Sequence, residues 1–391
     1  MKQGILNLSR EEVAEFLADK GAPKYRTNQL FTWLFRFGKT DFSEMTNIDL
    51  SLRRALDEWF YIYRPRIVRS DKSIDGTIKF LLELADKNTI ETVFIPETKR
   101  NTICVSSQVG CAIGCRFCNT GYHGFIRNLL PEEIVSQFLI VKDYLDLWHS
   151  QTRPPPKPPQ SDLLLGDTEH RSGVYSNVHE HSSTGSTKEE TDCGRLVRGS
   201  TERLSNIVFM GMGEPLLNHK NVLKSIDLLM SGEKDGISRR KITLSTSGIA
   251  DILKNIAKDL PCRLAVSLHA PNDSIRSKIM PINNVHNIKS ILGACEEYKK
   301  YHEYLKITFE YLLLDGINDS KECAQELLRL LSNQTCKVNL IQFNSWQGSQ
   351  FKASSRNKTL EFARILEDGG IEAPIRARRG EDIMAACGQL K

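Results

Sequence analysis

Short stretches rich in β-branched and aromatic residues alternate with amphipathic stretches from Thr102 onward. The β-rich stretches occupy residues 103–108, 206–213, 241–247, 263–269, 306–314 and 337–344. Apolar residues at helical spacing follow near 131–145, 219–230, 249–258, 287–301, 319–332 and 356–368. Six strand–helix repeats predict an α/β fold, in which a parallel sheet curls into a partial (β/α)6 barrel. Functional residues of such folds gather at the C-terminal ends of the strands.

The N-terminal part of the chain follows a different pattern, that of a small helical unit. Ser9 and Glu12 have the spacing of a capping box, Gly21 is a plausible helix end, and apolar residues cluster over 30–35 and 50–60. Residues 77–84 and 89–95 flank a short polar turn and predict a β-hairpin. We therefore expect four parts, in chain order: a helical accessory domain over 1–70, a β-hairpin linker over 71–101, the barrel over 102–375 and a C-terminal tail over 376–391.

One segment interrupts the alternation. Residues 146–203 contain a proline-rich run at 153–159 and then a stretch rich in Ser, Thr, His and Glu without an apolar period. This composition predicts a disordered insertion that begins with polyproline II character. His170, His179, His181 and Cys193 lie within it, but their irregular spacing favours a solvated linker over a metal site.

Composition narrows the class of protein only a little. The chain has 391 residues, 40% hydrophobic and 26% charged, as expected of a soluble globular protein. No apolar run is long enough to span a bilayer, so we expect no membrane partner. Ten cysteines without an export signal indicate the reducing cytoplasm. The net charge of +5 fits RNA binding no better than it fits many metabolic enzymes.

Three closely spaced cysteines carry the clearest chemical signal. Cys111, Cys115 and Cys118 form a C-x-x-x-C-x-x-C pattern. Three thiolates at this spacing can bind three corners of a [4Fe–4S] cluster and leave the fourth iron open to another ligand. A structural zinc site would need a second cysteine or histidine pair, and the sequence has none at the required spacing.

Five motifs in unbroken order extend this signal. They are 104–111 (CVSSQVGC), 211–215 (GMGEP), 244–248 (LSTSG), 267–271 (SLHAP) and 380–388 (GEDIMAACG). Together they resemble the RlmN family of dual-specificity rRNA and tRNA adenine C2 methyltransferases, within the radical S-adenosylmethionine (SAM) superfamily. The resemblance covers residues 1–145 and 204–391, and it implies that the partial barrel is a radical-SAM barrel.

The resemblance implies two cofactors, a [4Fe–4S] cluster and two molecules of SAM per turnover. Cys111, Cys115 and Cys118 would hold the cluster, whose open iron would bind one SAM. The family's SAM contacts match Gly213, Glu214, Ser245, Ser267, Leu268, His269 and Asn344. Any one of these would more often be an ordinary polar residue at a strand end; their occurrence on successive strands supports the assignment.

The resemblance also assigns catalytic roles to Cys387, Cys104 and Glu91. Cys387 would take a methyl group from one SAM, and a radical derived from the second SAM would activate it for addition to adenine C2. Glu91 would remove the C2 proton. Cys104 would then release the product and leave a disulfide with Cys387. Without the resemblance, Glu91 would be interpreted as an exposed strand residue.

The expected substrates are 23S rRNA, at the peptidyl transferase centre, and the adenine 3′ to the anticodon (position 37) of tRNAs. A Cfr-type adenine C8 methyltransferase is the alternative, although the full N-terminal unit and the closing AACGQL favour C2. An RNA-binding iron–sulfur protein without turnover would not explain Cys104, Glu91 and Cys387 together. The resemblance further implies a low-potential electron donor such as flavodoxin or ferredoxin, and a monomer.

Basic residues are the candidate RNA contacts. In the tail these are Arg376, Arg378 and Arg379, which can also favour a Cys387 thiolate. The N-terminal unit offers Lys24, Arg26, Arg36, Arg53 and Arg54. The sequence does not decide whether that unit contacts RNA or is only a satellite core.

Overall fold

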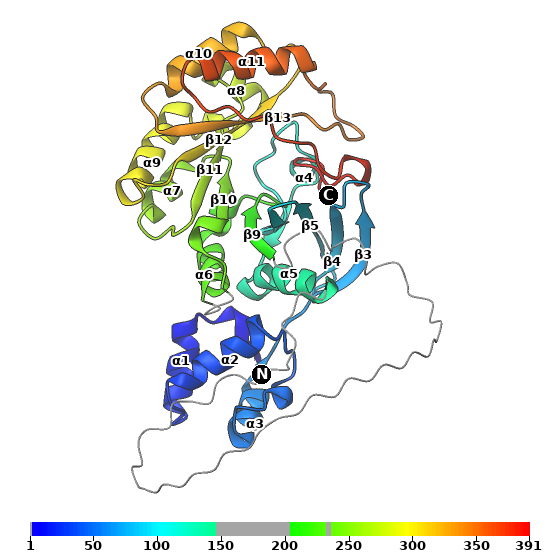
Figure 1. Cartoon of the computed structure of the whole chain (residues 1–391), viewed down its shortest axis with the longest axis vertical. Coiled ribbons are helices and arrows are strands. Elements are labelled where there is room, and N and C mark those ends of the chain that lie inside the picture. Colours follow the sequence, from blue (N-terminus) through cyan, green and yellow to red (C-terminus); the bar gives the residue numbers. More distant parts are fainter. Residues whose placement is uncertain (1, 146–203, 232–235) are drawn as a thin grey trace, which may run out of the picture.

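A nine-stranded sheet forms the centre of the computed structural model, which describes residues 2–145, 204–231 and 236–391 (Figure 1). Six neighbouring strands pair in parallel in the order β13-β12-β11-β10-β9-β6. These strands are β6 (Arg100–Cys104), β9 (Leu204–Phe209), β10 (Ile242–Thr246), β11 (Arg263–Ser267), β12 (Ile307–Leu313) and β13 (Cys336–Gln342). The six predicted barrel strands are thus confirmed, each with small shifts at its ends.

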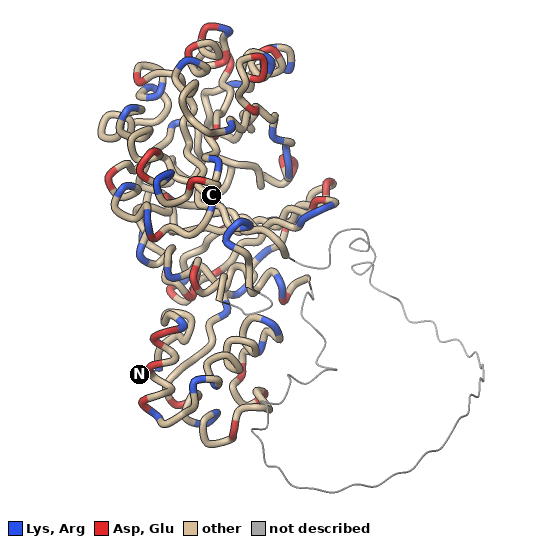
Figure 2. Tube along the Cα trace, turned by 60° about the vertical axis from the view of Figure 1, so that its left-hand side comes forward, with Lys and Arg blue, Asp and Glu red and all other residues tan. Residues whose placement is uncertain are grey.

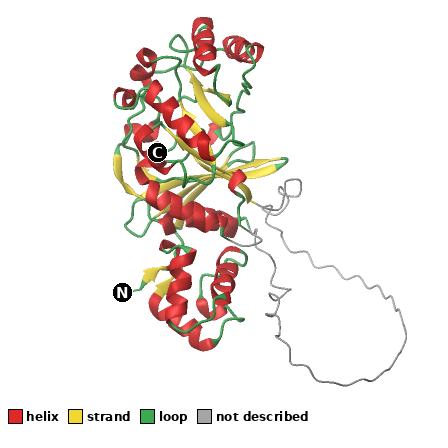
Figure 3. Ribbon diagram, turned by 90° about the vertical axis from the view of Figure 1, so that its left-hand side faces the viewer, coloured by secondary structure: helices red, strands yellow, loops and turns green. Residues whose placement is uncertain are grey.

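Helices connect these strands and cover the outside of the curved sheet (Figures 1 and 3). The predicted helices are α5 (Pro131–Tyr144), α6 (His219–Met230), α7 (Ala250–Ile256), α9 (Ile288–Tyr301), α10 (Lys321–Leu331) and α11 (Arg356–Asp368). Two short helices were not predicted, α4 (Asn119–Tyr122) and α8 (Asp273–Ile279). They are too short to show a helical period, and the Asn272 side chain that caps α8 is a signal typical also of turns.

The predicted hairpin is present, and it is continuous with the barrel sheet. β4 (Ile78–Glu83) and β5 (Thr89–Glu97) pair antiparallel, with β3 (Arg66–Lys72) outside β4 and β6 beside β5. The expected boundary between residues 101 and 102 therefore falls inside β6. Hydrogen bonds across β5 and β6 make the hairpin an extension of the barrel wall rather than a free connection, while the four-part division of the chain stays a prediction.

The N-terminal helices form a unit at one end of the molecule (Figures 1 and 3). It consists of β1 (Gln3–Gly4), α1 (Arg10–Asp19), α2 (Tyr25–Phe35), α3 (Leu50–Trp59) and β2 (Phe60–Tyr61). Ser9 and Glu12 form the predicted capping box. The buried side chains of this unit belong to one continuous hydrophobic core with those of the barrel.

Polar contacts also join the N-terminal unit to α5 and α6. Lys142 donates to the Phe35 carbonyl at 2.8 Å, Tyr61 donates to Glu132 at 3.0 Å, and Lys224 pairs with Glu12 at 2.8 Å. Arg26, one of the candidate RNA contacts, donates hydrogen bonds within the N-terminal unit, to the Asp49 carboxylate and to the Asn47 carbonyl. Lys and Arg are interspersed with Asp and Glu along the trace (Figure 2).

The insertion at 146–203, with its histidines and Cys193, lies outside the described residues. Among the helices that are described, none is both long enough and apolar enough to cross a membrane.

Two irregular segments complete the site end of the barrel. The first is the loop between β7 (Gln108–Gly110) and β8 (Phe125–Asn128), which pair antiparallel and include α4 between them. The second is the tail from Arg376 onward, whose regular structure is one 3-10 turn at Glu381–Ile383. The tail returns to lie beside β3 and β4 (Figure 1).

Candidate active site

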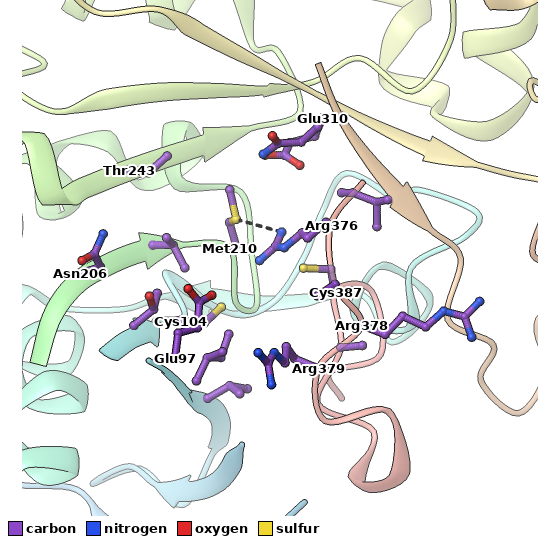
Figure 4. Close-up of a pocket in the computed structure, with 18 of the residues that line it drawn as sticks. Glu97, Cys104, Asn206, Met210, Thr243, Glu310, Arg376, Arg378, Arg379 and Cys387 are labelled. Carbon is purple, nitrogen blue, oxygen red and sulfur yellow. Dashed lines mark hydrogen bonds between the residues drawn. The ribbon is translucent and has the colours of Figure 1, made fainter. Parts of the chain in front are cut away.

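Two adjoining cavities lie on the inner side of the barrel, and they meet near the C-terminal ends of the strands. The smaller, of about 160 Å³, is lined by the three clustered cysteines and the ends of β9, β10 and β11. The larger, of about 740 Å³, runs along the inner face of the sheet and under the tail (Figure 4). Residues that line both are Met210, Glu310, Ile341, Arg376 and Cys387. Cys387 therefore lies where the two cavities meet.

Cys111, Cys115 and Cys118 all line the smaller cavity as free thiols. The loop is folded back on itself, because the Cys111 backbone N–H donates to the Gly124 carbonyl at 2.7 Å. Burial raises the pKa of Cys111 to about 12 and that of Cys115 well above its usual value. Half-buried thiols with raised pKa values are costly to ionise, and binding of a cationic cluster would offset that cost.

The donor set of the three cysteines fits a [4Fe–4S] cluster. They line one cavity, and three thiolates can bind three irons of such a cluster. Within the described ranges, no group of three or more His, Cys, Asp or Glu side chains is placed to hold one metal ion.

Gly213 and Glu214 follow β9 and line the same cavity. Gly213 has φ +98°, and a Cβ there would meet the Gln108 side chain at 2.5 Å, so only glycine fits this turn. The buried Glu214 carboxylate accepts from the backbone N–H of Ser247 at 2.7 Å and of Leu216 at 2.9 Å. Burial raises the pKa of Glu214. A carboxylate with spare lone pairs in this position can accept from a ligand ammonium.

Ser245, Ser267 and His269 lie at or just past the ends of β10 and β11 and also line the smaller cavity. Nδ1 of His269 accepts from the Leu312 backbone N–H at 3.0 Å, so the ring proton resides on Nε2. Burial lowers the pKa of His269 to about 3, which keeps the ring neutral. Leu268 is fully buried and is absent from the described lining of both cavities. Its backbone N–H donates to the Glu310 carbonyl at 3.1 Å, and its carbonyl accepts from Arg276 at 3.0 Å.

Three buried polar atoms near the cavities have no hydrogen-bond partner among the described residues: Ser247 Oγ, Glu310 Oε2 and Asn344 Oδ1. Unpaired buried polar atoms are costly, and a polar ligand bound in the cavities would satisfy these three. Asn344 lines the larger cavity, unlike the other predicted SAM contacts. A polar, multi-hydroxyl ligand such as SAM fits these atoms.

Cys104 and Cys387 are far apart in the sequence and line the same larger cavity (Figure 4). Burial raises the pKa of Cys104 to about 12; nearby Cys387 adds to the rise and Arg376 opposes it. Cys387 in turn raises the pKa of Arg376. Arg376 is held by its backbone N–H, which donates to the Leu340 carbonyl at 2.8 Å, and Nη1 lies 3.7 Å from Met210 Sδ. The guanidinium thus lines the same cavity as the two thiols and interacts electrostatically with both (Figure 4).

Glu91 lies on β5, two residues before Val93, which pairs with Cys104. Its carboxylate is 5% exposed and makes an ion pair with Lys79 at 3.0 Å, while its other oxygen accepts from the Lys391 backbone N–H at 2.8 Å. It faces the same side of the sheet as Cys104 but is absent from the described lining of both cavities. The alternative interpretation of Glu91 as an exposed strand residue is therefore wrong, because Glu91 is buried and paired; its role as the base stays a prediction.

Long-range contacts hold the tail at two places. On the hairpin side, Asp382 accepts from the Ser73 hydroxyl at 2.5 Å, and Asp75 accepts from the Gly380 N–H at 3.0 Å. On the cluster side, Asn119 and Thr120 donate to carbonyls of the last residues. Arg378 and Arg379 line the larger cavity beside these anchors.

Two residues that the sequence did not single out organise the site. Arg276, fully buried in α8, donates to the carbonyls of Ser247, Ser267 and Leu268 and so ties the ends of β10 and β11 together. Glu310, on β12, accepts from Asn339 and has its second oxygen free at the junction of the cavities. The sequence offered one signal for Glu310, which is a charged residue inside the apolar stretch 307–314. No sequence pattern marked Arg276.

The parallel barrel with a cysteine-lined cavity at its strand ends defines a radical-SAM protein. Consistent with this, residues 177–331 match the model of the radical SAM superfamily, and residues 3–62 match that of the ribosomal RNA large subunit methyltransferase N-terminal domain. A solved radical SAM methyltransferase from Sphaerobacter thermophilus is 35% identical, with a TM-score of 0.79 over 100% of this chain and 99% of that one.

Similar curated proteins define the family more narrowly. A dual-specificity RNA methyltransferase RlmN from Rhodospirillum rubrum is 42% identical over 99% of this chain and 80% of its own length. The RlmN of Paracoccus denitrificans is 42% identical over 100% of this chain and 90% of its own. The chain belongs to the RlmN family. Membership implies a [4Fe–4S] cluster and SAM as cofactors, as expected from the sequence.

Proposed function

We propose that this protein is a radical-SAM RNA methyltransferase that modifies C2 of adenine in 23S rRNA and at position 37 of tRNAs. The observation that carries the proposal is the position of Cys387, which faces both the cofactor cavity and the larger cavity that contains Cys104. A methyl carrier has to reach SAM on one side and RNA on the other. RlmN relatives of similar length support the choice of C2 over the Cfr-type C8 reaction.

In the proposed site, Cys111, Cys115 and Cys118 hold the cluster. Gly213, Glu214, Ser245, Ser267, the Leu268 backbone, His269 and Asn344 bind SAM. When bound, the cluster supplies the electron that cleaves SAM to a 5′-deoxyadenosyl radical. The protein's part would be to orient SAM beside the three cysteines and to exclude water, for which the cavity and the neutral His269 are suited.

Cys387 acts as methyl carrier and Cys104 as the thiol that resolves the enzyme–RNA link. Arg376 lines the same cavity and can stabilise either thiolate, which Cys104 needs because burial raises its pKa to about 12. We assign Glu91 as the base that takes the C2 proton. Since Lys79 and the Lys391 N–H occupy its oxygens, its action requires the end of the tail to move away from it.

The remaining assignments concern partners. Arg378 and Arg379 line the larger cavity and are proposed to bind RNA phosphates. We further propose a monomer in the cytoplasm that receives electrons from a low-potential donor such as flavodoxin or ferredoxin.

The decisive experiment is mass spectrometry of nucleosides from rRNA and tRNA of cells with and without the gene. We expect 2-methyladenosine in both RNAs only when the gene is present. Appearance of 8-methyladenosine instead would establish the C8 reaction, and unchanged nucleosides would exclude a methyltransferase of these substrates.

A further inference from the structure

The loop that holds the cysteines and the tail that carries Cys387 are joined by three hydrogen bonds. Asn119 donates its backbone N–H to the Gly388 carbonyl at 2.8 Å and its side-chain amide to the Gln389 carbonyl at 3.0 Å. The Thr120 hydroxyl donates to the Leu390 carbonyl at 2.7 Å. Asn119 and Thr120 directly follow Cys118, so the residues that grip the tail are covalently next to a cluster ligand.

These bonds are buried and therefore matter for the position of the tail. Asn119 is 8% exposed and Thr120 is 4% exposed. Removing a buried donor leaves its acceptor carbonyl without a partner. The free-energy penalty of that unpaired carbonyl is larger than the stabilisation that an exposed hydrogen bond provides. The tail has little regular structure of its own, so its path near Cys387 depends on such contacts.

Neighbouring contacts extend the link around Cys387. The Gln389 side chain accepts from the Ala386 N–H at 3.1 Å and donates to the Ser345 carbonyl at 2.8 Å, which brackets Cys387 on both sides. Trp346, next to Ser345, donates to the carbonyl of Phe117 in the cysteine loop at 3.0 Å. Loop, tail and the end of β13 thus form one hydrogen-bonded assembly.

We propose that Asn119 and Thr120 are positioning residues that latch the tail to the cysteine loop, so that Cys387 is held at the junction of the two cavities when the loop is ordered around its cluster. The inference rests on the proposed function, in which Cys387 carries the methyl group. Loading of the cluster would thereby control whether the methyl carrier is in place.

The test compares Thr120→Val, which removes the donor while keeping the side-chain shape, with Thr120→Ser, which restores the donor. Iron content, the visible absorption of the cluster and reductive cleavage of SAM to 5′-deoxyadenosine are measured first. We expect all three to remain near wild-type values in both variants. The rate of Cys387 methylation, followed by protein mass spectrometry, should fall about fivefold in Thr120→Val, as expected for one buried hydrogen bond, and recover in Thr120→Ser.

Hydrogen exchange provides a readout other than activity. In the wild-type protein, amides of residues 385–391 should exchange more slowly with the cluster loaded than after its removal by a chelator. Thr120→Val, and more strongly Asn119→Ala combined with Thr120→Val, should exchange fast in both states. Thr359→Val is the matched control, because the Thr359 hydroxyl donates to the Ser355 carbonyl at 3.0 Å within α11, and it should change none of these measurements.

Two results would overturn the proposal. One is Cys387 methylation at the wild-type rate in Thr120→Val; the other is a parallel loss of iron and SAM cleavage, which would mean that the hydroxyl serves the cluster rather than the tail. Failure of the proposed function is distinguishable from either result, because then the wild-type protein itself would methylate neither Cys387 nor RNA.

Discussion

The cysteine loop and the C-terminal tail contribute to one site but are built in opposite ways. Cys111, Cys115 and Cys118 lie within eight residues of each other, and local turns between β7 and β8 bring them together. The tail depends on partners far away in sequence, such as Ser73 for Asp382 and Asn119 for Gln389. Cluster binding and SAM cleavage, which depend on the loop, should therefore survive substitutions in the tail. RNA methylation, which needs the tail, should not survive loss of the cysteines in the loop.

The largest expected effect is on the loop side. Replacing Cys111, Cys115 and Cys118 together by alanine should reduce bound iron from about four atoms per chain to almost none after anaerobic reconstitution. SAM cleavage and RNA methylation should disappear with it. Iron and sulfide analysis of the purified variant is the measurement, and retention of the iron would refute the assignment of the ligands.

On the tail side, the cluster should remain while turnover is lost. Cys387→Ala should bind iron normally, acquire no methyl group and form no link to RNA. Cys104→Ala should acquire the methyl group and accumulate covalently attached RNA, since the resolving thiol is missing. Denaturing gels with and without nuclease separate the two outcomes. A Cys104→Ala protein with multiple turnovers would contradict these roles.

Glu91→Gln tests the assigned base. Loss of a general base should lower RNA methylation about 100-fold, while iron content and Cys387 methylation remain. RNA should then accumulate on the enzyme as it does in Cys104→Ala. Wild-type rates of RNA methylation in Glu91→Gln would instead make Glu91 only an anchor for Lys79 and the tail.

Lys79→Met separates that anchoring role from catalysis. Lys79 and Glu91 are 7% and 5% exposed, so removing the cation leaves a buried carboxylate without its partner. We expect a loss of about 3 kcal/mol in the free energy of unfolding, measured with denaturant. The double variant Lys79→Met/Glu91→Gln, which has no buried charge at this pair, should recover part of that stability; no recovery would show that the pair contributes little.

The smallest effect is expected at the rim of the larger cavity. Arg378→Ala and Arg379→Ala should weaken RNA binding severalfold, and each should lower the salt dependence of binding by about one unit in the log–log slope. Iron content and Cys387 methylation should not change. Binding curves at several salt concentrations provide the test, and an unchanged slope would exclude contact with phosphates.

Most strands and helices of the barrel could be predicted from the spacing of apolar residues in the sequence. Six apolar strands separated by amphipathic helices leave a curved parallel sheet with helices on its outer face as the simplest way to bury their apolar side chains. The same pattern could not show that β3, β4 and β5 continue that sheet, because edge pairing depends on hydrogen bonds between segments rather than on side-chain spacing. For the same reason the linker expected at 71–101 is part of the barrel wall.

Local sequence determined those parts of the site whose geometry is local: the cysteine loop, the turn that only Gly213 can make, and the strand ends that carry Ser245, Ser267 and His269. Tertiary structure alone decided the rest. In the fold, Arg276 donates hydrogen bonds that join the ends of β10 and β11, and Glu91 is a buried partner of Lys79. Cys387 lies at the junction of the two cavities. Burial and long-range hydrogen bonding, which give these residues their roles, depend on how distant segments pack, and no local pattern contains that information.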